Sequence, residues 1–120
     1  MLTLKIIGND GNLMGVWKGL SINAEYSGDL LPGDIIRVFA DGCSFVSMKL
    51  EPSFSESIVW LPNNRFEFVI PPESQRGMCY HPDAFLGDTH IISVREPDDD
   101  EVYGYRNIAL NSHDCHGVDR

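Results

Sequence analysis

The chain has 120 residues, a hydrophobic fraction of 42% and 18 acidic against 9 basic residues, so its formal net charge is −9. A chain of this length forms one domain around one hydrophobic core. Nucleic-acid binding depends on Lys and Arg that neutralise phosphates, and the sequence shows no basic cluster. We therefore expect neither a nucleic acid nor an anionic membrane surface as partner, whereas a neutral ligand such as a sugar is compatible with this charge.

The N-terminal segment Leu2–Ile7 alternates apolar and polar residues and predicts a strand, not a targeting signal. It lacks a basic region, a long apolar run and a small-residue cleavage site, and no apolar run in the chain reaches transmembrane length. We therefore expect a soluble, cytoplasmic protein. The three cysteines, Cys43, Cys79 and Cys115, lie far apart and do not match the close spacing of zinc or redox sites.

Short apolar segments separated by Gly, Pro and Asn turns continue through the first half of the chain and predict further strands. Leu13–Gly19 predicts a loop or a bulged strand because Trp17 lies between glycines. Ile35–Ala40 and Phe45–Leu50 predict two strands, and Asp41-Gly42 between them indicates a hairpin. Leu20–Tyr26 shows the cleanest alternation, which assigns one face to Leu20, Ile22, Ala24 and Tyr26.

The segment Ser57–Pro72 holds two runs of β-branched and aromatic residues separated by Pro62-Asn63-Asn64. Such residues suit a pleated, half-buried surface, and Asn tolerates left-handed backbone in a turn. We predict a β-hairpin in the core of a sheet, with Trp60 as a core residue because apolar residues flank it. The apolar face of the second arm is assigned to Phe66, Phe68 and Ile70.

The last third of the chain begins with Glu73–Asp88, which shows no sustained periodicity and predicts a long surface connection that Tyr80 and Phe85 pin to the sheet. His90–Glu96 predicts another strand. The run Pro97–Glu101 resembles a helix start, since carboxylates there complement the helix dipole, and the helix should be short because Gly104 follows.

Together these elements predict an all-β protein, an antiparallel β-sandwich that is jelly-roll-like, with about seven to eight strands and one short helix near the C-terminus. A partly open barrel is the nearest alternative, because the same pattern supports either architecture. Residues 1–111 form the sandwich domain, and residues 112–120 form a polar C-terminal tail.

Aromatic side chains are the first candidates for a ligand platform, because their faces stack on the C–H faces of sugar rings. Trp17, framed by glycines, is the best placed for exposure, and Arg37 is a candidate hydrogen-bond donor to hydroxyl groups. Tyr80 and His81 on the long connection complete the predicted ligand-binding set.

The sequence gives less support for a catalytic or metal-binding site than for a ligand platform. His81, Asp83, Asp88 and His90 lie close in sequence, which is compatible with a metal or an acid–base pair, but His81-Pro82-Asp83 is also typical of a turn. The tail His113–His116 could take up a transition metal adventitiously. No phosphate loop, dinucleotide fingerprint, nucleophile elbow or zinc-protease motif occurs, so we expect no resident metal, no cofactor and no catalytic residue.

Two stretches resemble a known group of proteins: C-Y-H-P-D-A-F-L-G-D-T-H at Cys79–His90 and Y-R-N-I-A-L-N-S-H-D-C-H-G from Tyr105, together with G-V-W-K-G at Gly15–Gly19 and the Leu31-Pro32-Gly33-Asp34 turn. They are similar to the N-terminal β-sandwich of uncharacterised bacterial proteins that often continue into a discoidin-like carbohydrate-binding module. The resemblance implies an accessory β-sandwich and glycan-related biology. This chain ends at Arg120, where that second module would begin, so we expect no sugar site of that module here.

The leading hypothesis is therefore a non-catalytic β-sandwich module that binds a ligand or a partner, with a saccharide as the candidate ligand. A structural module that forms a homodimer through an exposed strand edge or aromatic patch is the second hypothesis. The third is a small hydrolase or lyase built on the connection from His81 to His90.

Overall fold

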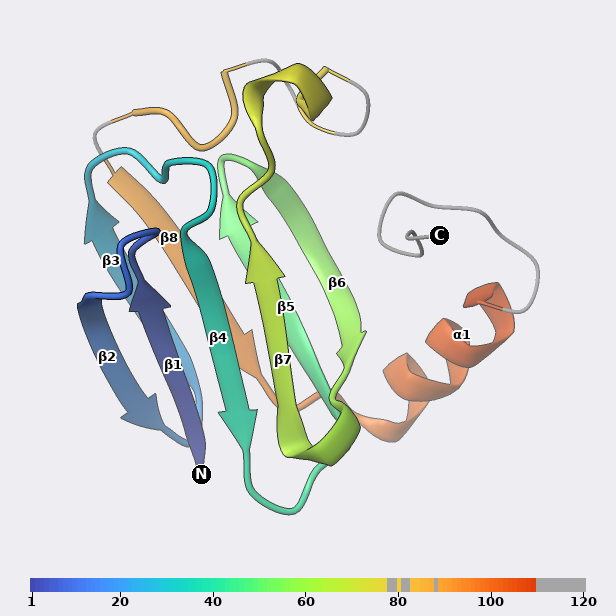
Figure 1. Cartoon of the computed structure of the whole chain (residues 1–120). Coiled ribbons are helices and arrows are strands. Elements are labelled where there is room, and N and C mark those ends of the chain that lie inside the picture. Colours follow the sequence, from blue (N-terminus) through green and yellow to red (C-terminus); the bar gives the residue numbers. More distant parts are fainter. Residues whose placement is uncertain (78–79, 81–82, 88, 110–120) are drawn as a thin grey trace.

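The computed structural model describes residues 1–77, 80, 83–87 and 89–109, and within these residues eight strands form two antiparallel sheets packed face to face (Figure 1). Sheet A has the strand order β2-β1-β4-β7, and sheet B has the order β3-β8-β5-β6. The strands are β1 (Leu2–Ile7), β2 (Leu13–Gly19), β3 (Ile22–Ser27), β4 (Ile35–Ala40), β5 (Phe45–Glu51), β6 (Phe54–Trp60), β7 (Arg65–Val69) and β8 (Thr89–Arg95). The predicted all-β sandwich with one helix near the C-terminus is confirmed.

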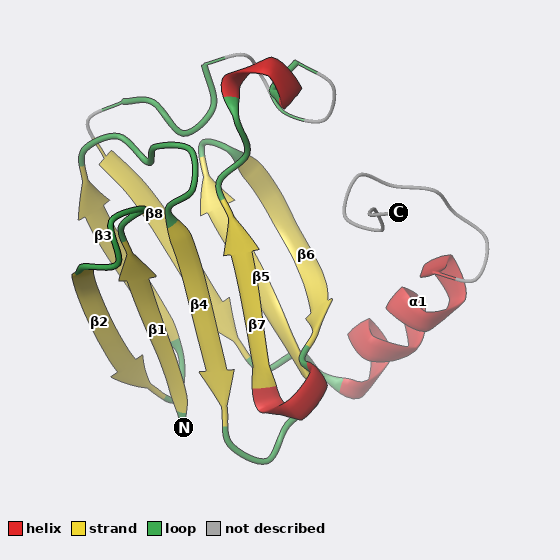
Figure 2. Cartoon of the chain, in the orientation of Figure 1, coloured by secondary structure: helices red, strands yellow, loops and turns green. Residues whose placement is uncertain are grey.

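Most connections cross from one sheet to the other, as in a jelly roll. The chain changes sheet between β2 and β3, β3 and β4, β4 and β5, β6 and β7, and β7 and β8, whereas β1–β2 and β5–β6 are hairpins within one sheet. Figure 2 shows the two layers of strands and the loops that join them at both ends.

The core lies between the sheets and is filled by alternate residues of each inner strand. In β1 and β4, every second side chain is buried, as the period of two in a strand requires. Fully burying an aliphatic side chain contributes about 1.5–3 kcal/mol relative to leaving it exposed. From β1 and β4 of sheet A and from β3, β5 and β8 of sheet B, the buried hydrophobic residues are Leu2, Leu4, Ile6, Ile22, Ala24, Ile36, Val38, Ala40, Val46, Met48, Leu50, Ile92 and Val94.

The predicted hairpin at Ser57–Pro72 is wrong, although both of its arms are strands. β6 pairs with β5 in sheet B, and β7 pairs with β4 in sheet A, so the turn η1 (Pro62–Asn64) carries the chain between sheets. Asn63 and Asn64 have φ of 58° and 62°, the left-handed backbone that Asn tolerates. The Asp41-Gly42 turn likewise joins β4 of sheet A to β5 of sheet B and is not a hairpin.

Two apolar side chains also face the wrong way relative to the sequence-based expectation. Trp60 is 56% exposed, because its neighbour Val59 pairs with Val46 on the core side and leaves Trp60, opposite Phe45, on the outer face. Leu20 is 84% exposed because β3 begins only at Ile22, so Leu20 lies in the turn that leaves sheet A.

The long connection after β7 is pinned to one end of the sandwich, as predicted. Phe85 is fully buried, and its ring packs against Phe68 and Tyr80 at centroid distances of 6.0 and 5.3 Å. The Phe85 N–H donates to Ser53 Oγ, and the Phe85 carbonyl accepts the Leu30 N–H. One aromatic residue therefore attaches the connection to loops that precede β4 and β6.

The helix α1 (Asp99–Ala109) is longer than expected, because it runs through Gly104. Asp98 and Glu101 form a reciprocal capping box, in which each carboxylate accepts the backbone N–H of the other residue at 2.8 and 3.0 Å. The cap offsets the loss of about 1 kcal/mol that Gly causes relative to Ala inside a helix. Across the described part of the chain, no helix combines the length and the apolar character needed to span a bilayer. Residues 112–120 lie outside the described residues.

Candidate functional site

Trp17 points into the sandwich and does not form an exposed platform. It pairs with Leu4, whose side chain is buried, and it packs against the core while remaining partly accessible. Its indole lies over Gly15 of the same strand, where an added Cβ would come within 2.6 Å of the ring. The glycine that suggested a loop in the sequence instead provides space for the tryptophan.

Arg37 points to the opposite side of the same sheet. It pairs with Lys5 and Glu67 in the register of β1, β4 and β7, and its Nε donates to the Glu67 carboxylate. Trp17 and Arg37 therefore cannot line one ligand site, because sheet A separates their side chains.

Tyr80 lies at the end of the sandwich to which the connection after β7 is attached, which we call the loop end. It packs beside Phe68 and Phe85, and burial raises the pKa of its hydroxyl. His81 and Asp88 lie outside the described residues, as does the tail segment His113–His116. Apart from His81, the predicted ligand residues lie in three different places. Trp17 faces the core, Arg37 faces outward, and Tyr80 belongs to the loop end.

Two polar side chains at the loop end are buried without partners. The three guanidinium nitrogens of Arg76 and both ring nitrogens of His90 form no hydrogen bond within the described residues. The Arg76 guanidinium carbon lies 5.4 Å from the centre of the Phe85 ring, and burial lowers the pKa of His90. Because these nitrogens are sealed from solvent, the described part of this end offers no reachable acid–base pair.

The outer face of sheet A carries polar and apolar side chains in rows set by the strand register. One row is Lys18, Thr3, Phe39 and Arg65, taken across β2, β1, β4 and β7. The next row is Val16, Lys5, Arg37 and Glu67. The Lys5 ammonium lies 5.4 Å from the centre of the Phe39 ring. In the described part of the chain no helix covers this face, since α1 lies beside β6 of the other sheet (Figure 1).

A depression of about 480 Å³ opens where β4, η1 and β7 meet on this face, and it is lined by Phe39, Pro62, Asn63, Arg65 and Glu67. Ligand sites combine apolar walls with a few polar groups that fix orientation, and they have volumes of about 300–1,000 Å³. None of the five lining residues belongs to the ligand-binding set that the sequence predicted. The signal was available only in the alternation of β7, which places Arg65 and Glu67 opposite the core face.

A second depression, of about 730 Å³, lies between the start of α1 and the loop before β5. Its walls carry Cys43, Glu96, Asp99 and Asp100, and burial raises the pKa of the Cys43 thiol. Among the described residues, no three His, Cys, Asp or Glu side chains come together as a metal site. A wall with three carboxylates and no cation is a poor match for an anionic ligand.

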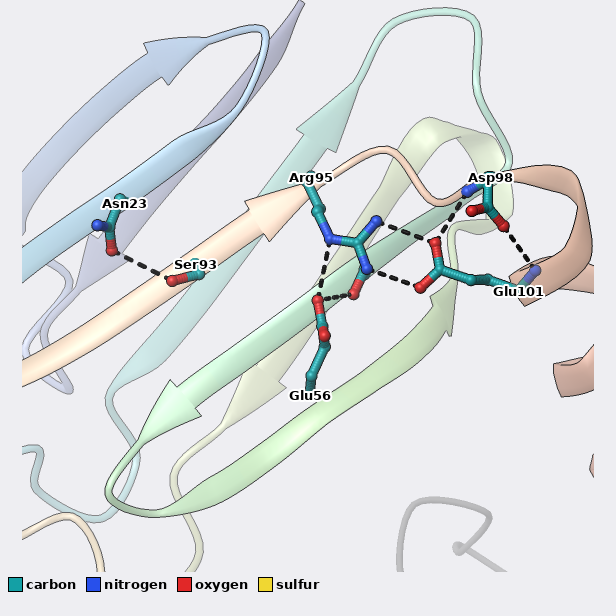
Figure 3. A network of polar contacts seen from close by, with 7 residues as sticks. Asn23, Glu56, Ser93, Arg95, Asp98 and Glu101 are labelled. Carbon is teal, nitrogen blue, oxygen red and sulfur yellow. Dashed lines mark hydrogen bonds and ion pairs between the residues drawn. The ribbon is translucent and has the colours of Figure 1, made fainter.

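The outer face of sheet B is occupied by a polar network that holds α1 (Figure 3). Arg95 donates from Nη1 and Nη2 to the two oxygens of Glu101 at 3.0 and 2.6 Å, and from Nε to Glu56 at 3.1 Å. Glu56 also accepts from the buried Ser47 hydroxyl, a hydrogen bond that is the main cause of its lowered pKa. The hydrogen bonds from Arg95 lower the pKa of Glu101 to about 2.

Comparison of the chain with protein-family models, with curated proteins and with solved structures finds no match. The assignment of a function therefore depends on the geometry of the two outer faces and of the loop end.

Proposed function

We propose that the protein is a non-catalytic β-sandwich module that binds a saccharide on the outer face of sheet A. The observation that carries the proposal is the depression beside Phe39, which combines an aromatic ring and Pro62 with the amide of Asn63 and the charged groups of Arg65 and Glu67. Sugars present apolar C–H faces and hydroxyl groups on one molecule, so a site needs both kinds of wall.

The Lys5 ammonium occupies part of the Phe39 ring, and a sugar would have to share or displace it. A cation–π contact at an exposed site contributes about 0.5–1 kcal/mol, so displacing the Lys5 ammonium requires little free energy. The remaining outer face is open, because Val69 and Val16 are 52% and 41% exposed and no described helix lies on them. A ligand can therefore extend from the depression along the sheet.

Backbone amide NMR titration with a panel of oligosaccharides tests the proposal. We expect the largest shifts in β4, η1 and β7, and we expect Phe39→Ala to weaken binding about tenfold, the equivalent of about 1.4 kcal/mol. Trp60→Ala is the matched control, since Trp60 is an exposed aromatic residue on sheet B. Absence of binding by every saccharide, or an equal loss in the Trp60 variant, contradicts the proposal.

A homodimer is a second candidate function, favoured by the edge strand β2. Leu13, Met14 and Val16 on this edge are 57%, 49% and 41% exposed, and an exposed apolar edge can pair with another strand. Sedimentation equilibrium tests it: a dimer that Val16→Lys dissociates supports the candidate, and a monomer at all concentrations contradicts it.

A further inference from the structure

We propose that the ligand of the sheet A face is an acidic saccharide, one that bears carboxylate or sulfate groups. This inference rests on the proposed function and names the class of sugar that the same site takes. It starts from the distribution of charge, because the molecule as a whole is strongly acidic and this face is not.

The outer face of sheet A gathers four of the nine Lys and Arg residues of the sequence, one from each of its strands: Lys18, Lys5, Arg37 and Arg65. Glu67 is the only carboxylate at the outward positions of these strands. The local charge is thus +3, obtained from four cations and one anion, against −9 for the whole chain. The cations are dispersed along the sequence, and only the sheet register brings them to one surface.

Three of these cations are available to a ligand. Glu67 pairs with Arg37 and neutralises it, whereas Arg65, Lys18 and Lys5 form no ion pair with any residue that the structure describes. Arg65 lines the depression, where its planar guanidinium can bind a carboxylate or sulfate through two parallel hydrogen bonds. The depression therefore contains an anchor for an acidic group beside the aromatic wall.

The spacing of the cations suits a short chain of sugars. Lys18 and Arg65 end the row that passes through Thr3 and Phe39, which is three strand spacings of roughly 4.8 Å, or about 14 Å. Lys5 lies in the next row between them. A long phosphate backbone would extend beyond this face onto acidic surface, so a short acidic oligosaccharide fits the arrangement better than a nucleic acid.

Paired ligands test the inference: an oligosaccharide of uronic acids, the neutral oligosaccharide with the same linkage, and a single-stranded oligonucleotide, each titrated by calorimetry. We expect the acidic sugar to bind at least tenfold more tightly than the neutral one, and this advantage to disappear near 1 M salt, where the Debye length is only about 3 Å. Arg65→Gln should remove the advantage, because the affinity for the acidic sugar should fall at least tenfold more than the affinity for the neutral sugar. Lys49→Gln on the outer face of sheet B is the matched control and should leave both affinities unchanged.

The outcomes separate the two proposals. Equal affinity for the acidic and neutral sugars overturns this inference and leaves the saccharide module intact. Absence of binding by both sugars overturns both. An oligonucleotide that binds as tightly as the acidic sugar shows a general anion surface and overturns the saccharide class. A loss of the acidic preference in Lys49→Gln overturns the assignment of the site to the outer face of sheet A.

Discussion

Two arginines show opposite ways in which this fold treats charge. Arg95 lies on the outer face of sheet B with its side chain 42% exposed, and it has two carboxylate partners, Glu56 and Glu101. Arg76 at the loop end is 2% exposed and has no hydrogen-bond partner among the described residues, only the ring of Phe85. The exposed guanidinium of Arg95 connects β8 to β6 and α1, whereas the buried guanidinium of Arg76 lowers the free energy of unfolding.

The physical reason lies in desolvation. A guanidinium cannot lose its proton in a protein, so burial removes hydration without the relief that a His obtains by becoming neutral. Arg95 keeps contact with water and adds a bidentate hydrogen bond, which explains why its own pKa is raised and that of Glu101 is lowered. Burial alone therefore does not show that a polar residue stabilises the fold. Its hydrogen-bond and ion-pair partners determine whether its contribution to stability is favourable.

The largest expected effect is at the buried arginine. Arg76→Leu should raise the free energy of unfolding by about 2 kcal/mol, because an apolar side chain replaces a buried charge that has no hydrogen-bond partner among the described residues. Urea denaturation measures the change, and Arg76→Lys, which keeps the charge, should give no gain. A destabilised Arg76→Leu protein would show that the guanidinium has a stabilising partner in solution and that the contrast with Arg95 is smaller than described.

At the exposed Arg95 we expect a loss of stability instead. Arg95→Leu removes the ion pairs to Glu56 and Glu101, which should lower the free energy of unfolding by about 1 kcal/mol and speed amide hydrogen exchange in α1. Arg37→Leu is the matched control, since Arg37 pairs with Glu67 on sheet A, whereas α1 lies beside β6 of sheet B. Equal exchange rates in α1 for both variants would mean that Arg95 does not hold the helix.

Acid titration tests the ion pair between Arg95 and Glu101 directly. The pKa of Glu101 is lowered from 4.5 to about 2 by its hydrogen bonds to Arg95, so its contribution is fully present above pH 4.5 and is lost as the pH falls toward 2. The signals of the first turn of α1 in NMR spectra should therefore persist at pH 3.5 and change near pH 2. In Arg95→Leu the change should occur closer to pH 4, and an unchanged midpoint would argue against the ion pair.

The smallest effect concerns His90. Burial lowers its pKa below 6.5 in the folded state, so the unfolded chain binds a proton first as the pH falls. Stability is complete above pH 6.5 and declines below it, down to the pKa of the folded state. Urea midpoints between pH 7.5 and 5.5 should fall for the natural chain and fall less for His90→Phe, and parallel curves would contradict the assignment.

Sequence reasoning succeeded where a property depends on near neighbours along the chain. The strand segments, the apolar faces of β1 and β7, and the anchoring role of Phe85 followed from period-two alternation and turn residues. It failed at Trp60, because in an unbroken apolar run either face can be the buried one until the partner strand is known. It also underestimated α1, because the capping box of Asp98 and Glu101 outweighs one glycine.

Alternation along each strand is a local consequence of backbone geometry, and this explains why the residues of the chain alone specified an all-β domain and the apolar faces of its clearly alternating strands. The assignment of β6 and β7 to different sheets, the row that joins Lys18 to Arg65, and the isolation of Arg76 depend on contacts between segments far apart in sequence. Strand pairing across such separations is decided by which apolar faces pack together, and only the folded arrangement contains that information.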